Sequence, residues 1–86
     1  MGKTRPTFRR WFQHFRENDL KRYRRALRYQ DQERFDQLLD DSEDYAMAAK
    51  AWNPPELREA VWLNLALAQQ REIDELRERV EALEGD

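Results

Sequence analysis

Arginine and lysine side chains are concentrated in the first thirty residues, and their chemistry suits phosphate recognition. Residues 1–30 hold ten basic residues against two acidic ones, whereas residues 31–86 hold six basic residues against sixteen acidic ones. A forked guanidinium group grips phosphate oxygens, and aromatic rings between such groups stack on unpaired bases. One interpretation is a nucleic-acid-binding face, for which the candidates are Arg9, Arg10, Lys21, Arg22, Arg24, Arg25 and Arg28.

The same cations have a second explanation, which is neutralisation by acidic side chains of this chain or of a second subunit. Pairing with Asp36, Asp40 and Asp44 would favour it. An anionic membrane surface is the least favoured partner, because the aromatic residues among the cations recur at the i, i+3, i+4, i+7 spacing of a helix face that packs into a core. These aromatic residues are Phe8, Trp11, Phe12 and Phe15.

Side chains for nucleophilic catalysis are poorly represented. Ser42 is the only serine and lies within an acidic run, and the only histidine, His14, lies far from it in the sequence. No nucleophile, base and orienting group occur at a suitable spacing. We therefore expect neither an enzyme nor a small-molecule substrate.

The acidic run at residues 40–44 is the one candidate for metal binding. It lacks the glycine turn and the terminal glutamate of a calcium loop, and consecutive helical residues point in different directions. The chain has no cysteine, and its only glycines are Gly2 and Gly85, which rules out a glycine-rich phosphate loop. We expect a solvated helix face here, with no metal site and no cofactor.

The apolar spacing predicts an all-α fold, a small array of three to four helices in one domain over residues 1–86. Thr4 or Thr7 would cap the first helix. The apolar stripe changes phase after Phe15, which predicts a break or a kink at Asn18. No segment alternates with period two. The expected helices are residues 7–17, 19–29, 32–51 and 54–84.

The last of these helices is the longest, and its start has a clear signature. Asn53 is a good N-cap, Pro54 suits the first helical position, and Glu56 lies where its carboxylate can reach back to the cap. No glycine or proline follows until Gly85. Residues 60–68 are apolar on nearly all sides, which indicates burial by other helices.

Beyond Gln69 the helix becomes charged except for a narrow apolar stripe. Ile73, Leu76, Val80 and Leu83 alternate at spacings of three and four, the a/d pattern of a coiled coil. β-Branched residues at a and leucine at d favour a parallel dimer. The flanks agree, because Glu72 would face Arg77 of a partner and Arg79 would face Glu84. This stripe predicts self-association through a coiled-coil extension over residues 70–84, and the alternative is packing on the chain's own N-terminal helices.

The sequence therefore predicts a non-enzymatic helical interaction module that forms a homo-oligomer, with nucleic-acid binding as the alternative. The longest apolar run is about nine residues, against roughly 20 for a membrane span. The N-terminus has no apolar signal segment. We expect a cytoplasmic protein without a membrane partner.

Four stretches of the sequence are similar to a known family. The opening G-K-T-R-P-T-F-R at residues 2–9 resembles the start of a family of small haloarchaeal proteins that has no assigned function. Y-R-R-A-L-R at 23–28, F-D-x-L at 35–38 and the run L-R-E-R at 76–79 are similar as well. The resemblance implies an archaeal source and brings no catalytic or binding residues.

Overall fold

The computed structural model describes residues 7–85, and within that range the chain is helical with no strand. A first helix, α1, covers Phe8–Ala26, and α2 covers Tyr29–Ser42. A short 3-10 helix, η1, at Glu43–Tyr45 leads into α3 at Ala46–Trp52. The last helix, α4, runs over Leu57–Glu84. The predicted all-α class with a long C-terminal helix is confirmed.

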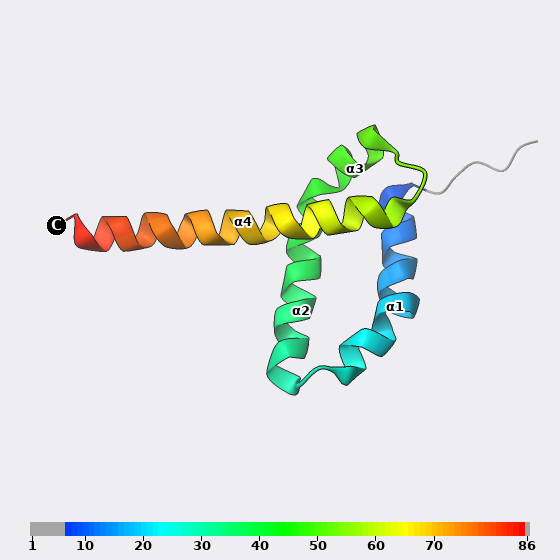
Figure 1. Cartoon of the computed structure of the whole chain (residues 1–86), viewed down its shortest axis with the longest axis horizontal. Helices are drawn as coiled ribbons and strands as arrows, with labels where there is room; N and C mark the ends of the chain where they lie inside the picture. Colours follow the sequence, from blue (N-terminus) through cyan, green and yellow to red (C-terminus); the bar gives the residue numbers. More distant parts are fainter. Residues whose placement is uncertain (1–6, 86) are drawn as a thin grey trace, which may run out of the picture.

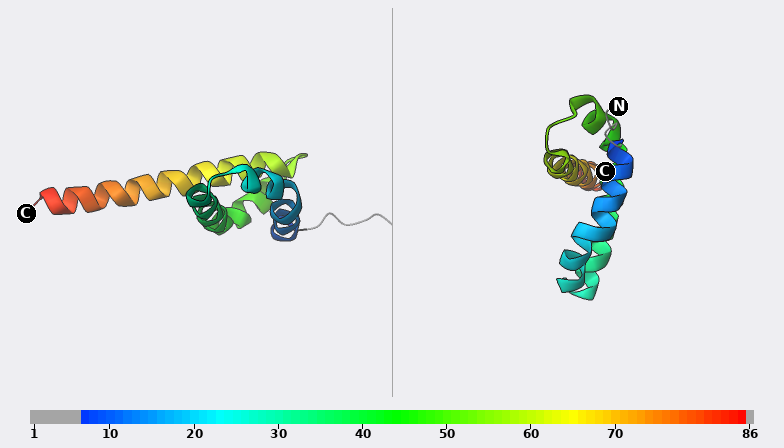
Figure 2. Two further views of the ribbon diagram at one scale, coloured as in Figure 1. Left: turned by 90° about the horizontal axis from the view of Figure 1, so that it is seen from below. Right: turned by 90° about the vertical axis from the view of Figure 1, so that its right-hand side faces the viewer.

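The helices form an open arrangement with extents of 64 × 31 × 15 Å. α1 and α2 run in opposite directions as a helical hairpin, and α4 lies across one end of this hairpin (Figure 1). The hairpin extends to one side of α4 and α3 lies on the other side (Figure 2). The second half of α4 projects beyond the other helices. We call residues 72–84 the rod and the remaining helical part the body.

α1 does not break at Asn18, because it is one helix from Phe8 to Ala26. The ribbon of α1 changes direction in its second half (Figure 1), so the break is wrong but the alternative of a bend is not. Asn18 stays within the helix and its side chain donates to the carbonyl of His14 at 2.9 Å. The change in stripe has another cause. The first half of α1 packs into the core, whereas Tyr23 in the second half packs on Phe35 of α2, with ring centroids 5.2 Å apart. Two predicted helices, 7–17 and 19–29, are therefore one helix with two packing partners.

The start of α1 agrees with the sequence. Thr7 is the N-cap, and its hydroxyl accepts a hydrogen bond from the backbone N–H of Arg10 at 3.3 Å. Such a bond satisfies one of the free N–H groups in the first helical turn. The other candidate cap, Thr4, lies outside the described residues.

The predicted helix over residues 32–51 is divided. α2 starts earlier, at Tyr29, and ends at the buried residue Ser42, after which η1 intervenes before α3. The Ser42 hydroxyl donates to the carbonyl of Leu39 at 2.7 Å, and such local bonds compete with the regular helical ladder. Tyr45 then leaves helical geometry, with φ −102° and ψ 14°. The chain bends here and turns α3 back along α4.

The start of the long helix was predicted too early. Asn53 adopts the left-handed conformation with φ 47° and ends α3, and its backbone N–H donates to the carbonyl of Ala49 at 2.9 Å. Asparagine favours this C-terminal position as well as the N-cap position, so its presence alone does not decide between them. Residues 53–56 form the connection, and Glu56 is the N-cap of α4. The helix has 28 residues, or about 42 Å.

The core lies where α4 crosses the other helices. Phe12 from α1, Leu39 from α2 and Val61 from α4 are each no more than 2% exposed. Phe8 stacks on Phe12 at 5.7 Å between ring centroids, as predicted for the aromatic face of the first helix. The buried residues of α4 end at Ala68, so the core does not extend into the rod.

Candidate interaction surfaces

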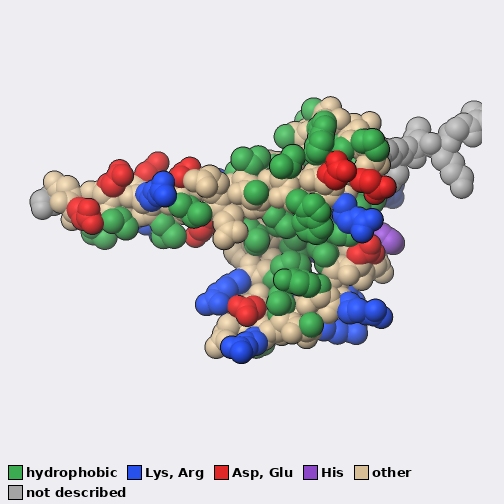
Figure 3. Space-filling model, viewed as in Figure 1, with side chains coloured by type: hydrophobic (Ala, Val, Ile, Leu, Met, Phe, Trp, Pro, Cys, Tyr) green, Lys and Arg blue, Asp and Glu red, His purple; other side chains and the backbone are tan. Residues whose placement is uncertain are grey.

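The rod carries the predicted self-association residues on an open surface. Ile73 is 38% exposed, Leu76 49%, Val80 50% and Leu83 82%. Every residue of the rod is exposed, so no other described element covers the stripe. Hydrophobic side chains are visible along one edge of the rod in Figure 3. The stripe is therefore not packed on the N-terminal helices, which was the alternative left open by the sequence.

A shallow hollow on the rod has the composition of a coiled-coil hole. It has a volume of about 340 Å³ and is lined by Ile73, Leu76, Arg77 and Val80, with Glu81 at its side. The first four residues occupy positions a, d, e and a of the heptad. In a coiled coil, four such residues form the hole that receives one side chain of the facing helix. The hollow thus has the residues to receive a leucine at position d.

The charged residues beside the stripe have no partner within the chain. Glu72, Arg77, Arg79 and Glu84 form no ion pair with any residue of the described range. All four are exposed. They remain available for the predicted pairing across a dimer.

Part of the basic half is neutralised within the chain. Arg16 contacts Asp40 at 2.7 Å and also donates to the carbonyl of Asp36 at 3.2 Å. Arg24 donates from Nε and Nη2 to the two carboxylate oxygens of Asp36, each at 2.8 Å. Arg71 on α4 contacts Asp44 at 3.0 Å. Of the seven predicted nucleic-acid-binding residues, Arg24 is therefore committed to the hairpin itself.

The other six predicted residues are exposed and form no ion pair among residues 7–85. Arg9 and Arg10 lie in the first turn of α1, at the end of the hairpin near α4. The remaining four surround the turn between α1 and α2. Tyr29 follows Arg28 in the sequence, begins α2 and is 74% exposed. We call this cluster the hairpin tip; its members are Lys21, Arg22, Arg25, Arg28 and Tyr29.

Tyr29 is a site residue that the sequence analysis missed. The aromatic residues expected on the apolar stripe of the first helix do pack in the core or against it, and these are Phe8, Trp11, Phe12 and Phe15. Tyr29 falls outside the stripe formed by Leu20, Tyr23 and Leu27, because two residues from Leu27 is the wrong spacing for one helix face. The position of Tyr29 outside the apolar stripe is the sequence signal from which the exposure of its side chain could have been predicted.

The Arg24–Asp36 pair gives a testable pH dependence. The hydrogen bonds from Arg24 lower the pKa of Asp36 below its usual 3.8, partial burial opposes this shift, and the charges of Arg24 and Arg16 add to it. A carboxylate with a lowered folded-state pKa contributes stability that is present above its unfolded-state pKa and is lost as the pH falls through the folded-state pKa. Asp36→Asn should lower the thermal midpoint slightly at neutral pH, and the difference from the parent should close below about pH 4.

The effect should be small because the Asp36 side chain is 37% exposed and the Arg24 side chain 43% exposed. Asp19→Asn is the matched control, since Asp19 is exposed and forms no ion pair in the described range. Thermal melts of the three proteins across the acid range make the comparison. A difference for Asp36→Asn that stayed constant with pH would contradict the assignment to this carboxylate.

One family covers the whole sequence, residues 1–86, and its description is a domain of unknown function, DUF8156. The chain belongs to this family. No curated protein and no solved structure matches it.

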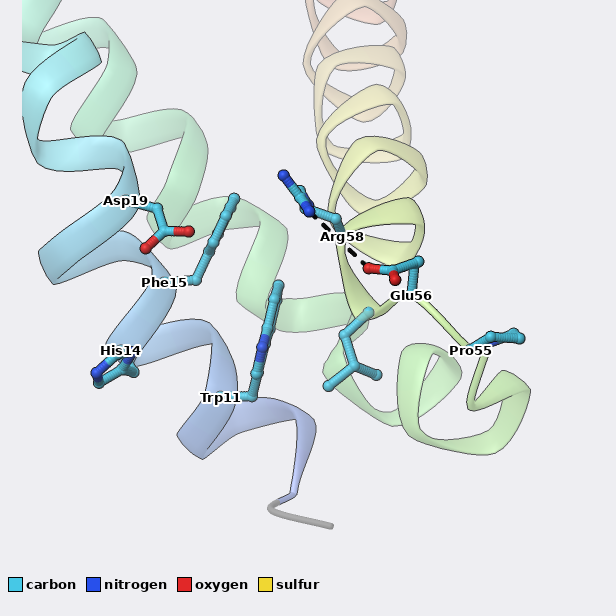
Figure 4. A pocket seen from close by; sticks show the side chains of 8 residues that line it. Trp11, His14, Phe15, Asp19, Pro55, Glu56 and Arg58 are labelled. Carbon is cyan, nitrogen blue, oxygen red and sulfur yellow. Dashed lines mark ion pairs between the residues drawn. The ribbon is translucent and has the colours of Figure 1, made fainter.

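A hollow between α1 and the start of α4 contains the only histidine of the DUF8156 chain. It measures about 330 Å³, and Trp11 and Phe15 form its apolar wall, with Glu56 and Arg58 on the opposite side (Figure 4). Arg58 contacts Glu56 at 3.9 Å. His14 lies at the outer edge, and no hydroxyl side chain is among the residues that line the hollow. The lining offers hydrogen-bonding groups but no hydroxyl or thiol side chain.

A smaller hollow lies between α3 and α4. It measures about 220 Å³, and its rim includes Trp52, Leu63 and Leu67, each at least half exposed. Asn64 also lines it, and the buried Nδ2 of Asn64 has no hydrogen-bond acceptor in the described part of the chain. Such a donor costs stability, and nothing in the DUF8156 fold indicates what would satisfy it.

Two further findings concern the described residues of the DUF8156 chain. No group of three or more histidine or acidic side chains within 7–85 is placed to hold a metal ion. None of the helices in this range combines the length and the apolar character needed to cross a membrane.

Proposed function

We propose that the DUF8156 chain is a non-enzymatic helical interaction module that self-associates through residues 69–84 of α4. The observation that carries the proposal is the exposure of the whole a/d stripe on a rod that no other described element covers. About half of the surface of Leu76 and of Val80 is open to solvent. Apolar side chains repeated at this spacing gain free energy when a second helix covers them.

A second copy of the chain is the partner that the rod fits best. The hollow beside Leu76 has the four residues that receive a leucine from the facing helix. Residue types at a and d favour two parallel strands. In that arrangement Glu72 faces Arg77 of the second copy and Arg79 faces Glu84, and both contacts are attractive. Since these charges have no partner within the described chain, pairing breaks no existing ion pair.

The direct test is the mass of the protein in solution, measured by sedimentation equilibrium or light scattering. The intact chain should have twice the mass of one chain, and a chain ending at Arg71 should be a monomer. Ending there keeps the contact between Arg71 and Asp44 and all the buried residues of α4. Circular dichroism of the shortened chain checks that the body remains helical. A monomeric intact chain would exclude the proposal.

A second candidate function is nucleic-acid binding at the hairpin tip. The observation that favours it is the gathering of four exposed cations without ion pairs beside an exposed aromatic ring, Tyr29. Arginines bind phosphate oxygens, and an exposed ring offers a surface on which a base can stack. Because Arg24 is paired with Asp36, the predicted nucleic-acid-binding residues that remain available are those of the hairpin tip together with Arg9 and Arg10.

This second function predicts DNA affinity that falls steeply with salt. Each phosphate contact contributes about 0.9 to the slope of log affinity against log salt, so the triple variant Arg22→Ala, Arg25→Ala, Arg28→Ala should flatten the slope by about 2 to 3. Arg24→Gln is the control, because Arg24 is held by Asp36 and should leave the slope unchanged. Fluorescence anisotropy with a labelled duplex measures both. Affinity that is absent at low salt, or independent of salt, would remove this function.

A further inference from the structure

The heptad stripe of α4 continues from the rod into the body. Counting back from Ile73 by spacings of four, three and four reaches Gln69, Ala66 and Trp62, which occupy positions d, a and d. All three are exposed, Trp62 at 51%. The exposed stripe thus runs from Trp62 to Leu83 without interruption. It spans three heptads, or about 32 Å, and Gln69 is its one polar position. Apolar a/d residues sustained over about three to four heptads are the pattern that indicates a coiled coil.

The sequence alone does not show this continuation. Only the burial of the neighbouring residues in the structure distinguishes the heptad positions from the other apolar residues. Residues 60–68 are apolar at nearly every position, so any helical face would look hydrophobic. In the structure, Val61, Asn64 and Ala68 are buried against the body. Trp62 lies about 100° around the helix from Val61, and Ala66 lies about 160° from Asn64 and from Ala68, and both remain open. The body of the protein therefore occupies one face of α4 and leaves Trp62 and Ala66 open, whereas Gln69 and Glu72 border a hollow of about 380 Å³ against α2.

We infer that two copies pair in parallel and in register along the whole stripe from Trp62 to Leu83, so that the interface includes the body. This inference rests on the self-association proposed above and extends it from the rod to the body. Ala66 at position a is small and lets the two helices approach closely. Trp62 closes the interface at the body end.

Gln69 distinguishes the parallel arrangement from an antiparallel one of the same extent. In a parallel pair in register, Gln69 meets Gln69 of the second copy, and the two amides can hydrogen-bond to each other. An antiparallel pair that aligns positions a with positions d sets Ala66 opposite Leu76 and Gln69 opposite Ile73, and it leaves Leu83 without a partner from the stripe. Each amide would then be buried against an apolar side chain, which costs free energy. The polar layer therefore selects the parallel register.

Single cysteines test the register, because the natural chain has none. Ala66→Cys and Leu76→Cys each place one thiol at an a or d position, where the parallel pair brings it next to its own copy. Ala82→Cys is the matched control, on the same helix but at an outward position of the heptad. Full-length proteins at about 10 μM are oxidised mildly, and the disulfide-linked fraction is followed over time on non-reducing gels.

Both a/d variants should cross-link about 100-fold faster than Ala82→Cys, because the effective concentration inside a dimer is in the millimolar range. If Leu76→Cys cross-links and Ala66→Cys is no faster than the control, the rod pairs but the body does not, and the inference is wrong while the proposed function stands. If neither exceeds the control, parallel self-association itself fails. If the Ala66→Cys, Leu76→Cys double variant cross-links but neither single variant does, the pairing is antiparallel and the inference is wrong.

Discussion

Leu76→Glu is expected to raise the dissociation constant of the proposed dimer by about 10² to 10⁴. Burying one leucine contributes roughly 1.5 to 3 kcal/mol, and the substitution removes one leucine from each of the two chains. At about 1.4 kcal/mol per factor of ten, the loss amounts to two to four orders of magnitude. Leu76 lies in the middle of the exposed stripe and lines the hollow on the rod. Sedimentation velocity over a range of protein concentrations measures the shift.

Ala82→Glu is the control for this substitution. It also adds a glutamate to the rod, but at an outward heptad position, so the dissociation constant should change little. Both residues are exposed in the single chain, so neither substitution should alter the helical content of the body. Equal weakening by the two variants would point to general charge repulsion and count against the a/d interface.

Phe12→Ala should have the largest effect on the stability of the fold. Phe12 is 2% exposed, stacks on Phe8 and belongs to the single core of the protein. Truncation of a buried phenylalanine costs about 3 to 5 kcal/mol. A domain of 86 residues has a total stability of roughly 4 to 13 kcal/mol, so the variant would lose a large share of it. The thermal midpoint should fall by about 12 °C or more.

Tyr29→Ala is the matched aromatic control, since Tyr29 is 74% exposed and should change the stability by no more than about 0.5 kcal/mol. The melts need one fixed protein concentration, because self-association makes the midpoint depend on concentration. A midpoint for Phe12→Ala within a few degrees of the parent would mean that α1 does not pack as described.

Periodicity predicted the helices well wherever one face of a helix has one partner. The apolar stripe from Ile73 to Leu83 could be recognised in the sequence because charged residues surround it. Its side chains are exposed in the structure, as the self-association hypothesis requires. The break at Asn18 was wrong because a stripe can rotate when the partner changes, while the backbone stays helical. Asn53 was placed at the wrong end of a helix because asparagine suits both ends.

The candidate surfaces depended on tertiary contacts to different degrees. The sequence could name the cations but could not decide which of them pair within the chain, because Arg24 and Asp36 meet only when the hairpin closes. In the same way, the division of residues 60–68 into a buried and an open face depends on the side from which the other helices approach α4. Trp62 was therefore visible as an apolar residue but not as part of an interface.

The lopsided placement of the α1–α2 hairpin determines what a two-fold assembly would look like. A two-fold axis parallel to α4 reverses every direction perpendicular to that axis. The hairpins of two parallel copies would therefore project from opposite sides of the paired α4 helices. Their positive ends would then face away from each other. With the nucleic-acid binding proposed for the hairpin tip, such a dimer would bind two separate polyanion segments, one on each side, and would bridge them more readily than it would enclose one.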